Sequence, residues 1–188
     1  MASLYFRYSV MNSGKSLDLL KTAFNYEEKQ RKILLLTSSL DDRYGHNKIK
    51  SRIGIEKSAI GIKKSDNIYK KFNFSEYDCV LVDEVQFFTK EQIFQLSDIV
   101  DNYNIPVICY GLRADFKQEP FEGSKYLMAI ADKIEELKTI CFCGEKATVN
   151  ARVINNKIVY DGEQIQIGGN ESYIPVCRKH FKEGKFKK

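Results

Sequence analysis

An eight-residue segment near the N-terminus has the residue types of a phosphate-binding loop. It spans residues 9–16 and reads Ser-Val-Met-Asn-Ser-Gly-Lys-Ser. A strand-like run precedes it and a helix-like run follows, which is the context that such a loop requires. Its backbone N–H groups would cradle an anion, Lys15 would reach the terminal phosphates, and the Ser16 hydroxyl would bind Mg²⁺. Because Ser9 stands where the motif has its first glycine, the simpler alternative is an ordinary Gly-Lys-Ser helix start.

Two carboxylates follow an apolar run, residues 79–82, and form a second candidate part of a nucleotide site. Asp83 would hold Mg²⁺, directly or through water. Glu84 would act as the base on the attacking group, since a carboxylate that is ionised at neutral pH needs only to reach the proton it takes. An attacking water would make an ATPase and an attacking alcohol a kinase, and the pair leaves both open. The alternative is two acidic residues that end a strand at the surface.

Three cysteines and a histidine in the C-terminal quarter match the ligands of a structural zinc site. Cys177 and His180 have the usual two residues between them, whereas Cys141 and Cys143 are separated by one. A closed tetrahedral site would replace the core that so small a lobe cannot build. The alternative is a set of free thiols. A disulfide framework is not expected, because the cysteine count is odd and no secretion signal is visible.

The elements that must position these residues alternate between strand and helix over residues 1–138. Continuous apolar runs predict buried parallel strands at 4–8, 32–37, 79–82 and 105–110. Helical spacing predicts helices at 17–28 and, after a cap at Thr89, through about residue 101. The order indicates an α/β fold with a mostly parallel sheet and helices on both faces. Ligands bind at the carboxyl ends of such strands, where the loop and the acidic pair would meet.

Residues 38–71 are polar, basic and difficult to assign. They carry the segments Asp41–Gly45 and Ser51–Gly54. A strand is expected near Ala59–Ile62, with a flexible segment before it. That segment is either a lid beside the phosphate site or a surface loop without a functional role.

The chain changes character near Lys138, where we place a domain boundary. Residues 139–188 contain short strands, turns and the metal-ligand residues, with a hairpin expected around Asn155-Asn156. The glycine-rich segment 161–173 has no helical period and is predicted to be a loop. Tethered at both ends, it would either close over a substrate or serve as a long connector.

The composition is that of a soluble globular protein, with 43% hydrophobic and 29% charged residues among 188. No apolar run approaches membrane-spanning length and no secretory signal is visible, so we expect a cytoplasmic protein without membrane contact. The net charge is +5, and much of it lies in residues 179–188. Such a short lysine-rich end is more typical of a solvated terminus than of a nucleic-acid-binding surface.

Six segments together resemble the type II thymidine kinases over essentially the whole chain, and the resemblance is to bacterial members of that family. In order they are 11–16 (Met-Asn-Ser-Gly-Lys-Ser), 41–44 (Asp-Asp-Arg-Tyr), 83–88 (Asp-Glu-Val-Gln-Phe-Phe), 110–116 (Tyr-Gly-Leu-Arg-Ala-Asp-Phe), 167–173 (Ile-Gly-Gly-Asn-Glu-Ser-Tyr) and 177–180 (Cys-Arg-Lys-His). Each is modest alone, but six in the right order are highly specific. The resemblance implies a RecA-like P-loop NTPase domain and a zinc-ribbon-like lobe that carries a lid loop.

The resemblance further implies transfer of the ATP γ-phosphoryl group to the 5′-hydroxyl of thymidine. The catalytic residues would be Glu84 as the base, Lys15 on the phosphates, and Arg43, which would help stabilise the transferred charge. ATP and Mg²⁺ would be bound by Ser9, Met11, Asn12, Ser13, Gly14, Lys15, Ser16, Asp83 and Gln86. Thymidine would be bound by Met11, Phe87, Leu112, Phe116, Phe121, Ile167, Gly169 and Tyr173. Deoxyuridine should also be accepted, since one methyl group is worth only about 1–3 kcal/mol.

The same resemblance implies a homotetramer that thymidine triphosphate inhibits, with structural Zn²⁺ on Cys141, Cys143, Cys177 and His180. Two rival readings predict different behaviour. A P-loop ATPase would hydrolyse ATP without a nucleoside, with Glu84 activating water. A zinc-ribbon protein that binds nucleic acid would show an affinity that falls steeply with salt.

Overall fold

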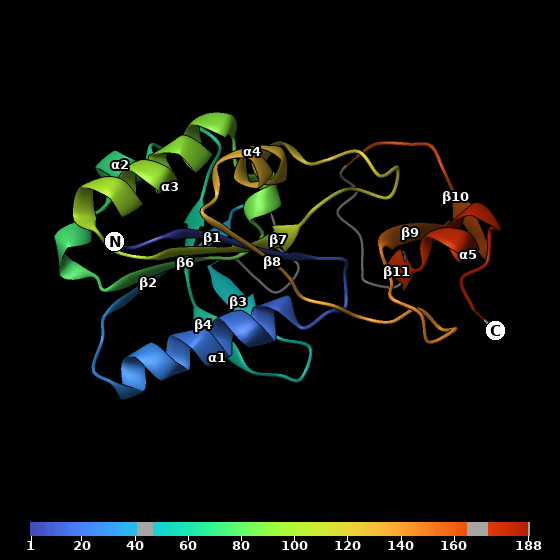
Figure 1. Ribbon diagram of the computed structural model, residues 1–188, viewed down its shortest axis with the longest axis horizontal. Coiled ribbons are helices and arrows are strands. Elements are labelled where there is room, and N and C mark those ends of the chain that lie inside the picture. The colour runs from blue at the N-terminus through green and yellow to red at the C-terminus, as the bar shows by residue number, and fades with distance from the viewer. Residues whose placement is uncertain (41–46, 165–172, 188) are drawn as a thin grey trace.

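The computed structural model describes residues 1–40, 47–164 and 173–187. A six-stranded sheet, in which every strand pair is parallel, lies at the centre of the first part of the chain (Figure 1). The strand order is β5-β2-β6-β7-β1-β8. The bounds are β1 Leu4–Ser9, β2 Ile33–Ser38, β5 Ile60–Ile62, β6 Cys79–Val82, β7 Val107–Leu112 and β8 Lys133–Glu136. The predicted parallel sheet is therefore confirmed.

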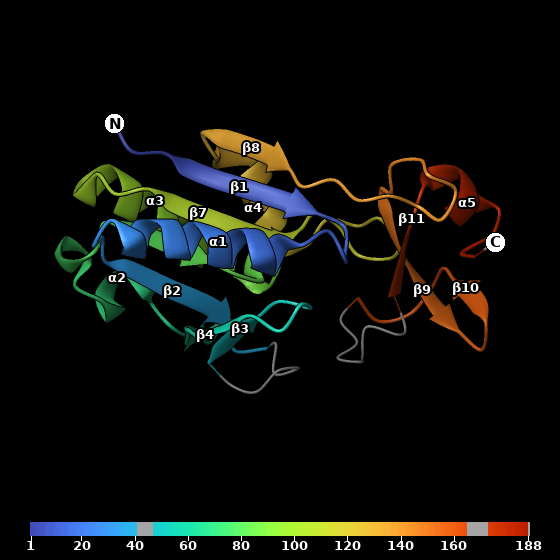
Figure 2. The same ribbon diagram turned by 90° about the horizontal axis from the view of Figure 1, so that it is seen from below.

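Helices cover both faces of this sheet. The helix α1 (Lys15–Glu28) lies on one face, and α3 (Lys90–Tyr103) and α4 (Glu122–Ile130) lie on the other (Figures 1 and 2). Short helical turns complete this part: α2 Ile68–Lys71, η1 Phe74–Glu76 and η2 Val85–Phe87. Each face has a buried apolar cluster, one around α1 and one around α3 and α4. Each aliphatic side chain buried there contributes about 1.5–3 kcal/mol, so packing fixes the helices on the sheet.

Thr89 caps α3 as the sequence predicts. Its hydroxyl accepts a hydrogen bond from the backbone N–H of Gln92 at 3.3 Å, and the Gln92 side-chain oxygen accepts one from the backbone N–H of Thr89 at 3.1 Å. This reciprocal capping box sets where α3 begins. The helix therefore starts directly after the turn that carries the acidic pair.

A hairpin occupies the position where the sequence predicts a flexible segment. It consists of β3 (Lys48–Lys50) and β4 (Glu56–Ser58). Ser51 closes it, because its hydroxyl accepts a hydrogen bond from the backbone N–H of Ile55 at 3.1 Å. Ile49 is buried in the cluster around α1. The sequence does not predict these two strands, because strands of three residues are too short to show an alternating pattern.

A polar cluster fastens β1 to α1 and β7. The Arg7 guanidinium donates hydrogen bonds to the Asp18 carboxylate at 3.0 Å and to the Tyr110 hydroxyl at 2.8 Å. The Tyr110 hydroxyl in turn donates to Asp18 at 3.0 Å. The elements on either side of the phosphate loop are thus held together. Within the described ranges, no helix has both the length and the apolarity to cross a membrane.

The C-terminal part forms a separate antiparallel sheet of order β10-β9-β11, beside a short helix (Figure 2). The bounds are β9 Val149–Ile154, β10 Lys157–Val159, β11 Tyr173–Val176 and α5 Arg178–Lys182. Asn155 and Asn156 join β9 to β10 with φ values of 48° and 60°, as a tight hairpin turn requires. The predicted hairpin is confirmed. The lobe's buried cluster is small and includes Val149, Ala151, Ile158 and Phe181.

Candidate active site

The segment between β1 and α1 forms a turn at the carboxyl edge of the sheet. Asn12 and Gly14 have φ values of 63° and 81°, and Gly14 directly precedes the helix. A left-handed backbone at Gly14 favours glycine, because a side chain would be strained there. The first N–H groups of a helix have no partner within it. The turn therefore presents the positive, N-terminal end of α1 to the cavity.

Ser9 takes the place of the loop's first glycine without disturbing this turn. Its side chain is only 3% exposed. The Ser9 hydroxyl donates to the carbonyl of Val10 at 2.7 Å and accepts from the Ser13 hydroxyl at 2.5 Å. The two hydroxyls thus join the two ends of the loop.

Lys15, Ser16 and Asp83 meet where the loop faces the end of β6. The Lys15 ammonium is buried and donates to the Val10 carbonyl at 3.3 Å, and the Ser16 hydroxyl donates to the Asp83 carboxylate at 3.2 Å. Burial raises the pKa of Asp83, the Glu84 charge raises it further, and Lys15 opposes both. A hydroxyl beside a buried carboxylate is a donor set that fits Mg²⁺.

Glu84 follows Asp83 in a left-handed conformation, with φ 51°. The Gln86 side chain fixes it there. Its amide nitrogen donates to the Glu84 carboxylate, and its amide oxygen accepts from the backbone N–H of Leu112 at 3.1 Å. Gln86 is only 2% exposed, so this link between the end of β6 and the end of β7 is shielded from solvent. The structure thus places Gln86 against the base candidate.

A cavity of about 310 Å³ lies in front of these groups. Apolar side chains line it, among them Met11, Phe87, Leu112, Phe116 and Phe121. Phe87 and Phe121 pack edge to face with their ring centroids 5.8 Å apart. The polar and apolar walls belong to one cavity, which is wide enough for a small planar molecule beside a phosphate chain.

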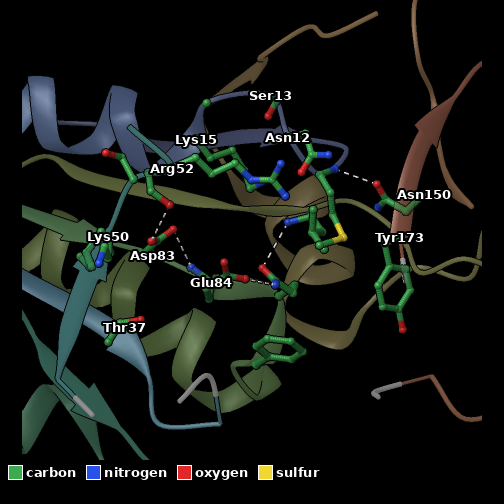
Figure 3. Close-up of a pocket in the computed structure, with 18 of the residues that line it drawn as sticks. Asn12, Ser13, Lys15, Thr37, Lys50, Arg52, Asp83, Glu84, Asn150 and Tyr173 are labelled. Carbon is green, nitrogen blue, oxygen red and sulfur yellow. Dashed lines mark hydrogen bonds between the residues drawn. The ribbon is translucent and has the colours of Figure 1, made fainter. Parts of the chain in front are cut away.

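The C-terminal lobe contributes a further wall. Figure 3 shows Asn150 and Tyr173 across the cavity from Asp83 and Glu84. Asn150 is buried, and its side-chain oxygen accepts a hydrogen bond from the backbone N–H of Met11 at 2.7 Å. The lobe is therefore in direct contact with the phosphate loop.

The hairpin β3–β4 brings cations to the cavity. Lys48, Lys50 and Arg52 line it together with Lys15, and Figure 3 labels Lys15, Lys50 and Arg52 among the residues around the cavity. Cationic side chains at a phosphate site favour an anionic ligand. The sequence singles out Ser51–Gly54 but gives no role to its arginine.

The predicted metal ligands come together at the far end of the lobe. One ligand atom from each of Cys141, Cys143, Cys177 and His180 lies within 4.8 Å of the others. Four ligands of a tetrahedral zinc ion lie about 3.5 Å apart, and His180 Nδ1 is 3.5 Å from the Cys141 sulfur and 3.4 Å from the Cys177 sulfur. Burial raises the pKa of Cys141, but hydrogen bonds from Cys143, Cys177 and His180 outweigh it and lower that pKa to about 6. The donor set fits zinc despite the short Cys-x-Cys spacing.

Comparison with known proteins gives the family. The family model described as Thymidine kinase matches residues 2–181. Thymidine kinases of Francisella tularensis subsp. holarctica and Haemophilus influenzae are 53% and 52% identical to this chain, over 98% and 97% of both chains. That of Lactococcus lactis is 52% identical over 96% of this chain and 97% of its own.

The chain belongs to the thymidine kinase family. Among solved structures, the Pif1 helicase from Candida albicans aligns with a TM-score of 0.45 and 16% identity over 74% of this chain and 36% of its own. That likeness is too low to add to the assignment.

Most of the residues that the thymidine kinase resemblance implies line the one cavity. They are Met11, Asn12, Ser13, Gly14, Lys15, Ser16, Asp83, Glu84, Gln86, Phe87, Leu112, Phe116, Phe121 and Tyr173. Ser9 joins the loop ends from outside the cavity lining. Arg43, Ile167 and Gly169 lie outside the described residues. The sequence alone indicates no role for Lys50, Arg52 or Asn150, although all three line the cavity.

Proposed function

We propose that this protein transfers the γ-phosphoryl group of ATP to the 5′-hydroxyl of thymidine, and also of deoxyuridine. One observation supports the proposal most strongly. In a chain of the thymidine kinase family, the phosphate loop, the acidic pair and an aromatic pocket all border a single cavity of about 310 Å³. Donor and acceptor can therefore meet without a large movement of the described elements.

The phosphate loop and its neighbours bind the donor. Residues 9–16, with Asp83, form the ATP and Mg²⁺ site: backbone N–H groups and Lys15 contact the phosphate oxygens, and Ser16 and Asp83 hold the metal ion. Bound Mg²⁺ neutralises charge on the phosphates. Lys15 and Arg43 stabilise the charge that moves with the transferred group. Gln86 is a further residue of the ATP and Mg²⁺ site.

Glu84 acts as the base. The 5′-oxygen of thymidine forms a bond to the γ-phosphorus while the bond from that phosphorus to the β–γ bridging oxygen breaks. The hydroxyl proton moves to the Glu84 carboxylate, and the bridging oxygen leaves with ADP. Because Gln86 donates to the same carboxylate, it keeps one Glu84 oxygen occupied and orients the other.

The aromatic wall binds the base of the nucleoside. Met11, Phe87, Leu112, Phe116, Phe121 and Tyr173 enclose the thymine ring and its methyl group, and Ile167 and Gly169 contribute from the lid loop. The apolar lining of the cavity supports this assignment. Deoxyuridine fits the same pocket with a modest loss of binding.

We further propose that Zn²⁺ on the four Cys and His ligands stabilises the C-terminal lobe, residues 139–188, which forms a domain distinct from residues 1–138. The resemblance supports a cytoplasmic homotetramer that thymidine triphosphate inhibits and that binds neither nucleic acid nor membrane. Thymidine triphosphate carries in one molecule both the nucleoside of one substrate and the phosphate groups of the other, so it would compete for the same cavity.

Glu84→Gln tests the reaction. ADP release from Mg-ATP is measured with and without thymidine, for the wild type and the variant. We expect turnover that requires thymidine, yields thymidine monophosphate and falls by about 10²-fold or more in the variant, because the base is lost. Equal ADP release without nucleoside would instead support an ATPase and refute the kinase proposal.

A further inference from the structure

Arg152 on β9 has no part in the mechanism above, yet it contacts two residues of the cavity wall. It is only 2% exposed. Its guanidinium faces Phe116 and Tyr173, which both line the cavity. We propose that Arg152 is a positioning residue that sets the aromatic wall of the nucleoside pocket. The inference rests on the proposed function, since it names what holds that pocket in shape.

Two hydrogen bonds fix the Tyr173 side chain. The Tyr173 hydroxyl oxygen accepts from Arg152 Nε at 2.9 Å and from Arg152 Nη2 at 2.5 Å. Because one oxygen receives both donors, the phenol cannot swing in either direction without losing a bond. The planar fork of arginine makes this double contact, which an ammonium group cannot reproduce.

The same guanidinium supports the Phe116 ring. Its central carbon lies 3.7 Å from the centroid of that ring, within stacking distance. Phe116 is almost fully buried and lines the cavity. Since Arg152 also lies 5.2 Å from the Tyr173 ring centroid, one side chain sets the positions of both aromatic groups.

Arg152 also binds the start of the glycine-rich segment. Its Nη2 donates to the backbone carbonyl of Glu163 at 2.8 Å. The neighbouring Gly162 has a φ of 132°, and a Cβ there would lie 3.2 Å from Arg152 Nη1. The backbone therefore passes directly over the guanidinium, and one cation joins this segment to the aromatic wall.

The surroundings of Arg152 indicate that it orients the groups around it. Within the described residues no carboxylate forms an ion pair with it, and its guanidinium instead contacts a phenol, a carbonyl and a ring face. Burying a cation in this way is costly, and an apolar side chain of similar volume would fill the space without that cost. What an apolar side chain cannot do is hold Tyr173, Phe116 and Glu163 in fixed relative positions.

Steady-state kinetics on Arg152→Met and Arg152→Lys test the proposal. A displaced wall weakens nucleoside binding before and during transfer alike, so the KM for thymidine should rise about tenfold while kcat and the KM for ATP stay within about twofold. Arg152→Lys should fail to restore the wild-type KM, because it keeps the charge without the fork. A lysine variant with wild-type KM values would overturn the proposal, as would equal changes in both KM values.

Two further variants separate positioning from stability. Ile158→Ala weakens the buried cluster of the same lobe, and its KM for thymidine should remain near that of the wild type although its unfolding temperature falls. Tyr173→Phe removes the hydroxyl acceptor. It is the milder change, and it tests the same contact should Arg152→Met fail to fold. It should raise the KM for thymidine in the wild type, but not further in the Arg152→Met background, because the shared contact is already lost. Additive effects would overturn the proposal.

The wild-type assay distinguishes the two levels of inference. If the wild type phosphorylates thymidine and the Arg152 variants keep its KM, the positioning role alone fails. If the wild type does not phosphorylate thymidine, the proposed function fails and the inference about Arg152 fails with it.

Discussion

The Gln86 side chain helps to hold the base candidate in position. Gln86 contacts Glu84 with its nitrogen and the backbone N–H of Leu112 with its oxygen. Gln86→Leu removes both contacts and leaves a buried N–H group unpaired, at a cost of about 1–3 kcal/mol in stability. We expect kcat to fall by about 10²-fold, since a base that is not held in place loses much of its effect. Steady-state assays should show little change in the KM for ATP.

Gln95→Leu is the matched control for this variant. The Gln95 side-chain oxygen also accepts a backbone N–H bond, from Ile68 at 2.8 Å, but it does not line the cavity. A similar loss of stability with unchanged kcat is expected. If both variants lose activity equally, the role given to Gln86 is wrong.

Sequence alone identifies the phosphate loop and the acidic pair because each is a short segment next to a recognisable strand. Asn150 could not be found this way. Its partner, Met11, is 139 residues earlier in the chain, and the contact exists only once the C-terminal lobe packs against the loop. The same holds for Arg152, whose role depends on the register of β9 and on the position of Phe116.

At the scale of elements, α4 packs against the turn that follows Asp83 and Glu84. Gly123 makes this close approach possible, because a Cβ there would lie 2.2 Å from the backbone carbonyl oxygen of Val85. Gly123→Ala must therefore displace η2 or α4. We expect a loss of about 3 kcal/mol in the free energy of unfolding, measured with urea, and a reduced kcat because η2 carries Gln86.

Met128→Ala on the same helix serves as the comparison. Met128 is 41% exposed, so its truncation should change the free energy of unfolding by less than about 1 kcal/mol. Equal stability of the two variants would show that the close contact at Gly123 is not important.

The strands and the two long helices are predictable because packing on two faces produces long apolar patterns. Shorter elements are not. The helix α4 has Gly123, a residue of low helix propensity, in its first turn, and β8 reads Lys-Ile-Glu-Glu, with its first three residues exposed. Both form because they pack or pair with elements far away in the sequence, β8 with β1 for example.

At the scale of the whole molecule, the cavity depends on a lobe with a small core. We expect one zinc ion per chain. Its removal by a chelator should lower the unfolding temperature by about 5 °C or more. It should also raise the KM for thymidine more than that for ATP, because the lobe supplies Asn150 and Tyr173. Metal analysis, thermal unfolding and kinetics on the same sample would measure all three.

Cys109→Ala provides the control for cysteine loss, since Cys109 is a buried thiol in β7, outside the metal cluster. It should retain one zinc ion per chain, whereas Cys177→Ser should not. A protein that is fully active and contains no zinc would contradict the structural role of the metal.

The order of the strands has a consequence for synthesis on the ribosome. The first strand to be made, β1, pairs with β7 and β8, and among the described residues it pairs with no strand made earlier than residue 107. At about 5–20 residues per second, β1 must wait several seconds for its first neighbour. The phosphate loop that follows it lacks its scaffold during that time. A chain that ends before residue 107 therefore contains the phosphate-loop segment without the strands that position it.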